Sequence, residues 1–454
     1  MNRRADARAP SKGSAREERM PLYAGVSEAN ITPPPGVWMS GYAGRPTGCT
    51  GVHDELHARA LVLQDGDRCS VAIVACDLIG FDFEVVDRVR SAIGSELGTE
   101  PSSVMLCATH THGGPTTRTF GAMGPSDAAY MSVLERKLVG VARQAAEALQ
   151  PASLAYGRSA AQIGVNRRQA TGAGTVLGCN WGGPVSPVVH AIVVRDSRGG
   201  AYAVLVSHAC HAVTMGGDNL RITADYPGAA CTAIKEMTAG AVLPIYLQGC
   251  CGDVNPLQRG TWEAVAHNGR VVADAAIEAM EAATSASNST LRVQEAPIEL
   301  PYLPPPPADV AERDLALAEA SVALARERGH AGAVMNAEGL RDHAAYVLRL
   351  AQAGRPPDAV RSQVQCITLG EARVLGLPFE PFVEYALHLE AAHPGPVIVA
   401  GYTNGEHGYL PTAAEYARGG YELETAQRYY GTLMLDPACE RIVLEACKQL
   451  LAQS

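Results

Sequence analysis

The sequence predicts an α/β fold in which a mixed β-sheet core is flanked by helices. From Val26 onward, short apolar runs alternate with longer segments of helical periodicity. Apolar residues make up 47% of the 454 residues, and the 46 Gly and 29 Pro follow no Gly-X-Y repeat. This composition is typical of a globular chain with many loops, and the length is ample for a large core.

The predicted strands are short and nearly continuously apolar, as strands buried on both faces are. They cover residues 59–63, 70–76, 103–108, 188–195, 201–207, 243–248, 365–369, 373–377 and 397–401. Helical patterns cover residues 83–93, 128–149, 226–237, 262–283, 310–328, 340–353, 381–391 and 437–452. Asp225 is the expected N-cap of the third of these helices.

Residues 1–20 are expected to form a disordered leader, because they are basic and lack the apolar centre of a secretory signal. Residues 21–454 are interpreted as one domain. Within it, the five prolines of 301–307 exclude a helix or a central strand and predict a stiff connector. The Ala- and Arg-rich stretch 308–355 is predicted to be a helical insertion with a structural role.

Composition and charge also narrow the classes of binding partner. The formal net charge of −10 gives no electrostatic reason to bind nucleic acid. No apolar run reaches about 18 residues, so no transmembrane segment is expected. The 12 cysteines lack the spacing of a disulfide framework, which indicates reduced thiols and a cytoplasmic protein. Tyrosines near the C-terminus, including Tyr429 and Tyr430, fit either a polar-lined pocket or a homo-oligomer contact.

Candidate metal ligands lie where two predicted strands end. One strand ends at His110 and His112, whose i, i+2 spacing places both side chains on one side of an extended chain. A second strand leads into His208 and His211. Each pair alone also fits strand caps or packed histidines. Because ligand sites gather at strand ends, the two occurrences together favour a metal site.

A third strand meets a glycine-rich turn that begins at Cys250 and Cys251. The double cysteine suggests a thiol nucleophile or a zinc thiolate, but no second pair has zinc spacing, and packing is the favoured interpretation. Glycine in the turn permits close backbone approach to a ligand. Gly252, Asp253 and Asn255 are therefore predicted to shape a substrate-binding pocket.

Four segments occur in one order: 108–115 (Ala-Thr-His-Thr-His-Gly-Gly-Pro), the His211 segment, 224–228 (Ala-Asp-Tyr-Pro-Gly) and 248–256 (Gln-Gly-Cys-Cys-Gly-Asp-Val-Asn-Pro). That order resembles the neutral/alkaline ceramidase family. The similarity extends from about Leu22 to the C-terminus and covers the family's catalytic domain. The family's usual C-terminal immunoglobulin-like domain has no counterpart, which implies a short, bacterial-type member.

The resemblance implies a mononuclear zinc amidohydrolase with one Zn²⁺ per chain. The positions that match the family's metal ligands are His110, His211, Glu380 and Tyr409. Two imidazoles, a carboxylate and a phenolate oxygen are all acceptable zinc donors, and zinc that retains a water can generate hydroxide near neutral pH.

The same resemblance assigns the remaining active-site groups to His112, Arg167 and Tyr421. Any of the three is suited to stabilise the negative oxygen that forms when an amide carbonyl is attacked. His112 is also a candidate proton carrier for the leaving amine, because an imidazole titrates near neutral pH.

One position departs from the family. Asn255 stands where the ceramidases carry Ser, and an amide side chain cannot accept an acyl group. Metal-activated water is then the expected nucleophile. Ceramide and a smaller soluble amide both remain candidate substrates.

Three functions are compatible with these residues. The first is a zinc-dependent amidohydrolase that cleaves a linear, non-peptide amide of a small molecule. The second is an ester or lactone hydrolase that uses the same zinc site. The third is a catalytically inactive homologue that only binds a ligand, for which Asn255 is the direct support. Matched N-acyl and O-acyl substrates would distinguish the first two.

Overall fold

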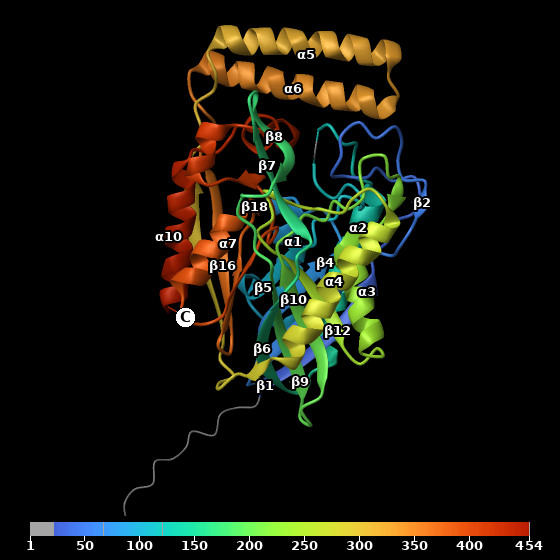
Figure 1. Ribbon diagram of the computed structural model, residues 1–454, viewed down its shortest axis with the longest axis vertical. Helices are drawn as coiled ribbons and strands as arrows, with labels where there is room; N and C mark the ends of the chain where they lie inside the picture. The colour runs from blue at the N-terminus through green and yellow to red at the C-terminus, as the bar shows by residue number, and fades with distance from the viewer. Residues whose placement is uncertain (1–21, 67, 120, 454) are drawn as a thin grey trace, which may run out of the picture.

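The computed structural model describes residues 22–66, 68–119 and 121–453, and the predicted leader lies outside them. Two β-sheets pack face to face, and helices cover the outer face of each (Figure 1). The predicted mixed α/β architecture is confirmed, with a second sheet added to the expected one.

The larger sheet has nine strands in the order β12-β10-β9-β6-β1-β3-β4-β5, with β14 attached to β6. The pairs β4/β5 and β10/β12 are parallel, and the other pairs are antiparallel. The strands are β1 Leu22–Asn30, β3 His57–Asp65, β4 Arg68–Cys76, β5 Val104–Ala108, β6 Gln150–Ala160, β9 Val188–Asp196, β10 Ala201–His208, β12 Leu243–Gln248 and β14 Thr284–Ser285.

The second sheet has the order β15-β16-β17-β19. Its strands are β15 Leu291–Leu300, β16 Val360–Leu369, β17 Ala372–Gly376 and β19 Val397–Ala400. Leu61 and Leu205 of the larger sheet share one buried cluster with Ile367, Val374 and Ile398 of the smaller. Because these side chains are removed from water by the opposite sheet, this cluster holds the two sheets together.

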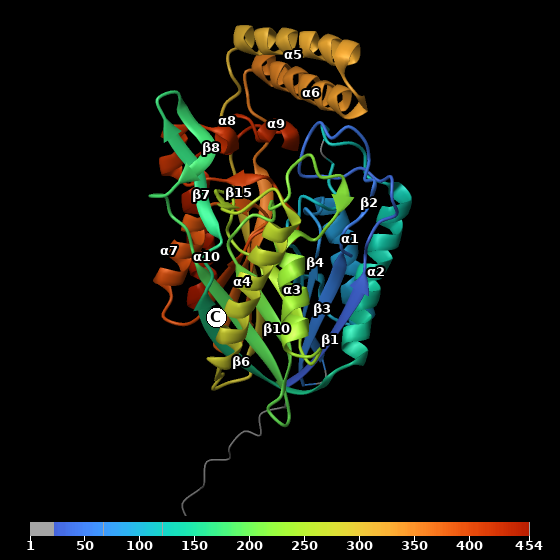
Figure 2. The ribbon, with the colours of Figure 1, turned by 45° about the vertical axis from the view of Figure 1, so that its right-hand side comes forward.

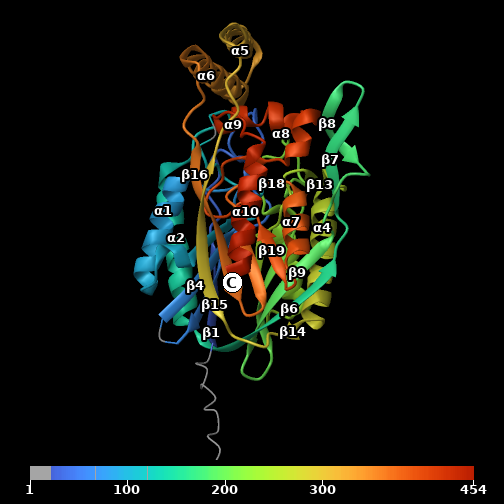
Figure 3. The same ribbon diagram turned by 90° about the vertical axis from the view of Figure 1, so that its left-hand side faces the viewer.

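Amphipathic helices bury the outer faces (Figures 2 and 3). On the larger sheet, α1 Phe83–Leu97 and α2 Ala128–Glu147 cover one half, and α3 Asp225–Met237 and α4 Trp262–Glu281 cover the other. On the smaller sheet lie α7 Val383–Ala392 and α10 Ala438–Gln453. Among the described residues, no helix has both the length and the apolar character needed to cross a bilayer.

Short strands and helical turns lie within the loops at one end of the sheets. The small strand pairs are β2 Gly51–Val52 with β11 Arg221–Ile222, and β18 Glu380–Pro381 with β20 Tyr409–Leu410. A three-stranded ribbon joins β13 Val254–Pro256, β7 Gly164–Thr171 and β8 Gly174–Asn180. The helical turns η2 Ala413–Arg418, α8 Tyr421–Glu424 and α9 Gln427–Tyr430 also belong to these loops, whereas η1 Pro101–Ser103 precedes β5 and lies at the other end of that strand.

Two helices form a hairpin across this end of the molecule (Figures 1 and 3). They are α5 Ala308–Arg328 and α6 Ala331–Ala353, within the predicted insertion 308–355. Gly332 lets α6 approach the body, since a Cβ there would lie 1.6 Å from the carbonyl oxygen of Arg45. Helix α6 begins earlier than the predicted residue 340 because the His330 side chain caps it by accepting from the backbone N–H of Ala333.

Candidate metal centre and its cavity

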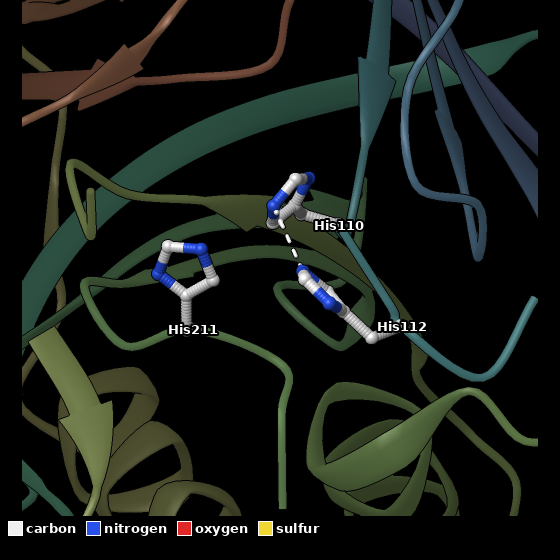
Figure 4. A group of neighbouring side chains, drawn as sticks. All are labelled: His110, His112 and His211. Atoms are coloured by element: carbon white, nitrogen blue, oxygen red, sulfur yellow. Dashed lines mark hydrogen bonds between the residues drawn. The ribbon is translucent and has the colours of Figure 1, made fainter. Parts of the chain in front are cut away.

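Three histidines converge where β5 and β10 end. The backbone of His110 leaves β5 with a left-handed φ of 59°, and His211 follows the end of β10. The ligating nitrogens of His110, His112 and His211 all lie within 4.8 Å of one another. Figure 4 shows the three rings around one space, with a dashed line between His110 and His112, whose Nε2 atoms are 3.2 Å apart.

A backbone contact at Nδ1 fixes the orientation of each imidazole ring. In every case Nδ1 contacts a backbone carbonyl oxygen, which assigns the proton to Nδ1 and leaves an Nε2 lone pair available in a neutral ring. The partners are Ile79 for His110 at 2.7 Å, Gly41 for His112 at 3.0 Å and Cys251 for His211 at 2.5 Å. Two Nε2 lone pairs held this close repel each other unless a proton or a metal cation lies between them.

Burial keeps two of these rings uncharged. It lowers the pKa of His211 to about 4 and, with the neighbouring imidazoles, holds the pKa of His112 well below its usual value. For His110, burial also lowers the pKa, but the Glu380 carboxylate outweighs it and raises the pKa overall. The carboxylate of Glu380 thus favours a proton on His110. A bound divalent cation would supply the positive charge in place of that proton.

Glu380 adds a carboxylate to the histidines. Its Oε2 lies 3.3 Å from His110 Nε2 and 3.1 Å from His211 Nε2. The parallel pairing of β18 with β20 places Glu380 directly opposite Tyr409. The imidazoles of His110 and His211 and the carboxylate of Glu380 meet in a buried space, with His112 beside them, and this donor set suits the zinc that the sequence implied.

Arg167 joins several of the predicted catalytic groups. Its Nη2 donates to the Tyr409 hydroxyl at 2.9 Å, and its Nη1 donates to Asn255 Oδ1 at 3.2 Å. Its Nε donates to Glu422 at 2.7 Å, which balances the charge. A cavity of about 460 Å³ opens beside this arginine, and its lining includes His112, Arg167, Asn255, Tyr409 and Tyr421.

Gly252 and Asp253 lie behind β18 and do not line this cavity. The N–H of Gly252 donates to Pro381, and a Cβ at Gly252 would lie 2.6 Å from the carbonyl oxygen of Glu380. The Asp253 carboxyl accepts from the backbone N–H of Val383 and from Asn166 Nδ2, both at 2.8 Å. Both residues hold the backbone that carries Glu380, whereas Asn255 faces the cavity.

The expected N-cap role of Asp225 is wrong. Ala224 precedes the helix, and Asp225 is its first residue, with a left-handed φ of 54°. Its buried carboxylate accepts from the backbone N–H groups of Thr214 and Met215, at 3.1 and 3.0 Å. Asp225 therefore holds the loop that follows His211.

Three further residues around Glu380, namely Tyr430, Glu406 and, through Glu406, Arg118, were not assigned to the metal site from sequence. The Tyr430 hydroxyl donates to Glu380 and also lies 3.0 Å from Glu406. Arg118 Nη1 is 3.3 Å from the fully buried carboxylate of Glu406. The sequence holds one indication for Glu406, because it lies in the same loop as Tyr409, a predicted ligand.

Cys250 and Cys251 are packed as expected. Burial raises the pKa of both thiols well above its usual value, so neither is a ready thiolate. Cys251 Sγ contacts the Tyr402 hydroxyl at 3.1 Å, and Cys250 Sγ faces the carbonyl oxygen of Val399.

Fold and site together define a mixed α/β domain that carries a candidate metal centre at strand ends. Residues 22–286 match the neutral/alkaline non-lysosomal ceramidase N-terminal family. The chain therefore belongs to this family, in agreement with the resemblance seen in its sequence motifs.

Curated relatives match over a short stretch. The chain is 35% identical over 96 residues to a neutral ceramidase of Drosophila pseudoobscura pseudoobscura and 34% identical over 96 residues to that of Drosophila melanogaster. These matches cover 20% of this chain and only 13% of each fly protein.

Solved structures share the fold over nearly the whole chain. The neutral ceramidase from Pseudomonas aeruginosa superposes with a TM-score of 0.71 at 19% identity, over 96% of this chain and 75% of that one. A ceramidase complexed with C2 superposes with a TM-score of 0.73 at 18% identity, over 96% and 76% of the two chains.

Proposed function

We propose that this chain is a zinc-dependent hydrolase that cleaves the C–N bond of a linear, non-peptide amide in a small molecule. One observation carries the proposal: the Nε2 atoms of His110 and His211 and the carboxylate of Glu380 meet beside a cavity that Arg167 and Tyr421 also line. Membership of the ceramidase family supports an amide as the bond that is cleaved.

The metal would be held by His110, His211, Glu380 and Tyr409. When bound, zinc supplies Lewis-acid activation of water and polarisation of the amide carbonyl.

Arg167 and Tyr421 donate hydrogen bonds to the carbonyl oxygen of the substrate. The guanidinium of Arg167 donates to Glu422, Asn255 and Tyr409 and lies 3.5 Å from His211 Nδ1, which fixes it at the wall of the cavity that the substrate enters. Burial raises the pKa of Tyr421, so its hydroxyl keeps its proton and can donate as well. Donors fixed in place before the reaction stabilise negative charge that develops on the oxygen.

His112 moves the proton. Its Nδ1 is held by Gly41, and its Nε2, 3.2 Å from His110 Nε2, is the atom that takes a proton from water and returns it to the departing nitrogen; the lowered pKa of His112 favours the return step. Asn255 has a positioning role, because its Oδ1 accepts from Arg167 and its amide cannot act as a nucleophile.

Substitution of the proposed ligands tests the function. His110→Ala and His211→Ala should each lose the zinc measured by elemental analysis. Because a Lewis acid contributes several kcal/mol, their kcat/KM on an N-acyl amide panel should fall by about 10³-fold or more. His267→Ala, at an exposed position on α4, should retain both properties.

Folding is monitored by circular dichroism, so that a loss of activity is not confused with unfolding. Matched O-acyl esters in the panel separate an amidase from an esterase. A folded His211→Ala protein without metal and with full amide turnover would refute the proposal.

A further inference from the structure

The cavity beside the candidate metal centre is basic, although the whole chain carries a net charge of −10. Its lining residues within the described part of the chain include Arg167 and Arg259 and no Asp or Glu. The charge of Arg167 is balanced from behind by Glu422 at 2.7 Å. Arg259 is an exposed side chain at the edge of this cavity, and it supplies the second positive charge of the lining.

Arg259 is held in place by neutral groups. Its Nε donates to the carbonyl oxygen of Val213 at 3.0 Å, and its guanidinium hydrogen-bonds to Tyr42. The Tyr42 hydroxyl in turn donates to the carbonyl oxygen of Met215 at 3.0 Å. Within the described ranges, no carboxylate forms an ion pair with Arg259. The side chain is therefore oriented by neutral contacts while its charge and most of its five N–H donors stay available.

The position of Arg259 connects it to the reacting groups. It lies four residues after Asn255, at the end of a segment whose strand β13 pairs with β7, the strand of Arg167. His112 and Arg259 line the same cavity of about 460 Å³, a volume typical of small-molecule sites. Both residues therefore border the space that a small substrate would enter.

We infer that the substrate is an amide that carries an anionic oxyacid group, as an N-acyl amino acid does, and that Arg259 pairs with this group. The inference rests on the proposed amide hydrolysis and names its substrate class. A guanidinium offers two parallel N–H donors to a carboxylate or sulfonate, and a cavity without acidic residues favours such an anion over a cationic substrate.

A series of amides with one acyl chain tests the pairing. The amine half is glycine, taurine or methylamine, which supplies a carboxylate, a sulfonate or no charge. The wild-type protein should prefer the charged amides, and the two charged arms identify which anion it prefers. Arg259→Gln should lower kcat/KM for them by about 10- to 100-fold, mainly through KM, and leave the N-methyl amide within twofold. Arg259→Lys should recover part of the loss.

Arg198→Gln is the matched control, because it removes the same charge from a side chain that is 89% exposed. It should leave every amide unaffected. Equal effects of Arg259→Gln on charged and uncharged amides, or a wild-type preference for the N-methyl amide, would overturn the inference.

A binding measurement separates this inference from the proposed function. Calorimetric titration of N-acylglycine into wild-type and Arg259→Gln protein requires no turnover. Weaker binding by the variant supports the anion site even if none of the amides is hydrolysed, in which case the proposed function fails by itself. Equal binding by both proteins contradicts the anion site, whatever the turnover.

Discussion

Asp253 shows how a buried residue can support the site without facing the substrate. Its carboxyl accepts two hydrogen bonds, from Val383 and Asn166, which favour the ionised form. Burial outweighs them and raises the pKa of Asp253 from 3.8 to about 7. In the folded protein this carboxyl therefore keeps its proton up to about neutral pH.

The raised pKa of Asp253 predicts a loss of stability as the pH rises from about 4 to 7. In this window the unfolded chain has released the proton that the folded chain still binds, so the free energy of unfolding falls, by at most about 4 kcal/mol. Asp253→Asn has no such proton, and its free energy of unfolding should lack this part of the fall.

Urea denaturation of both proteins at pH 5 and pH 7, in the presence of a chelator, measures the difference. Parallel pH profiles for the two proteins would contradict the raised pKa.

At the residue scale, the sequence points to candidate ligands that directly follow strands. It does not point to the side chains that contact these ligands. The strand patterns pointed to His110 and His112 and to His208 and His211, and the family resemblance selected His110, His211 and Glu380 as ligands. Tyr430 and Glu406 had no such signal, because their contact with Glu380 depends on how distant loops fold onto one another.

At the scale of elements, a pair of adjacent arginines ties β7 to the segment that carries Tyr421. While Arg167 reaches the cavity, Arg168 donates to Glu422 at 2.5 Å and to Glu415 at 2.8 Å. All of these side chains are largely buried. Ion pairs of this kind contribute position more than net stability, but removal of one partner leaves a buried charge.

Removal of Arg168 should therefore be costly. Arg168→Met leaves Glu415 with the exposed Arg418 alone and Glu422 with Arg167 alone, and should lower the free energy of unfolding by about 3 kcal/mol. Arg418 pairs with the same Glu415 at 2.9 Å, but its side chain is 63% exposed. Arg418→Met should cost less than about 1 kcal/mol. Chemical denaturation of the two variants and the wild type checks both values, and equal losses would contradict the importance of burial.

Elements with a strong pattern were predicted, and elements without one were missed. Every predicted strand and helix is present with shifted ends, such as α7, which begins at Val383 because Pro381 belongs to β18. The longer strands β1, β6, β7, β8 and β15 were missed, as were the short strands of two or three residues, β2, β11, β13, β14, β18 and β20. β15 contains polar residues and Pro297, and much of β8 is exposed, so neither shows an apolar run. Their strand state depends on pairing with distant partners, which local pattern does not encode.

At the scale of the whole molecule, the candidate metal centre joins parts of the chain that lie far apart. His110 follows β5, at the edge of the larger sheet, and His211 follows β10 of the same sheet. Glu380 and Tyr409 come from the C-terminal part of the chain, which also forms most of the smaller sheet. A cation bound by all four would connect the layers at the end where the loops meet, so its binding energy should appear as folding stability.

Zinc should therefore stabilise the folded protein without being required for the fold. The two sheets and their helices keep their buried clusters whether or not a cation is present, so the chelated protein should stay folded and melt at a lower temperature. Free zinc at about 1,000 times its dissociation constant should add about 4 kcal/mol. Differential scanning calorimetry should show that zinc raises the melting temperature of the wild-type protein and not that of His211→Ala. A zinc-dependent rise of equal size in both proteins would place the metal elsewhere in the molecule.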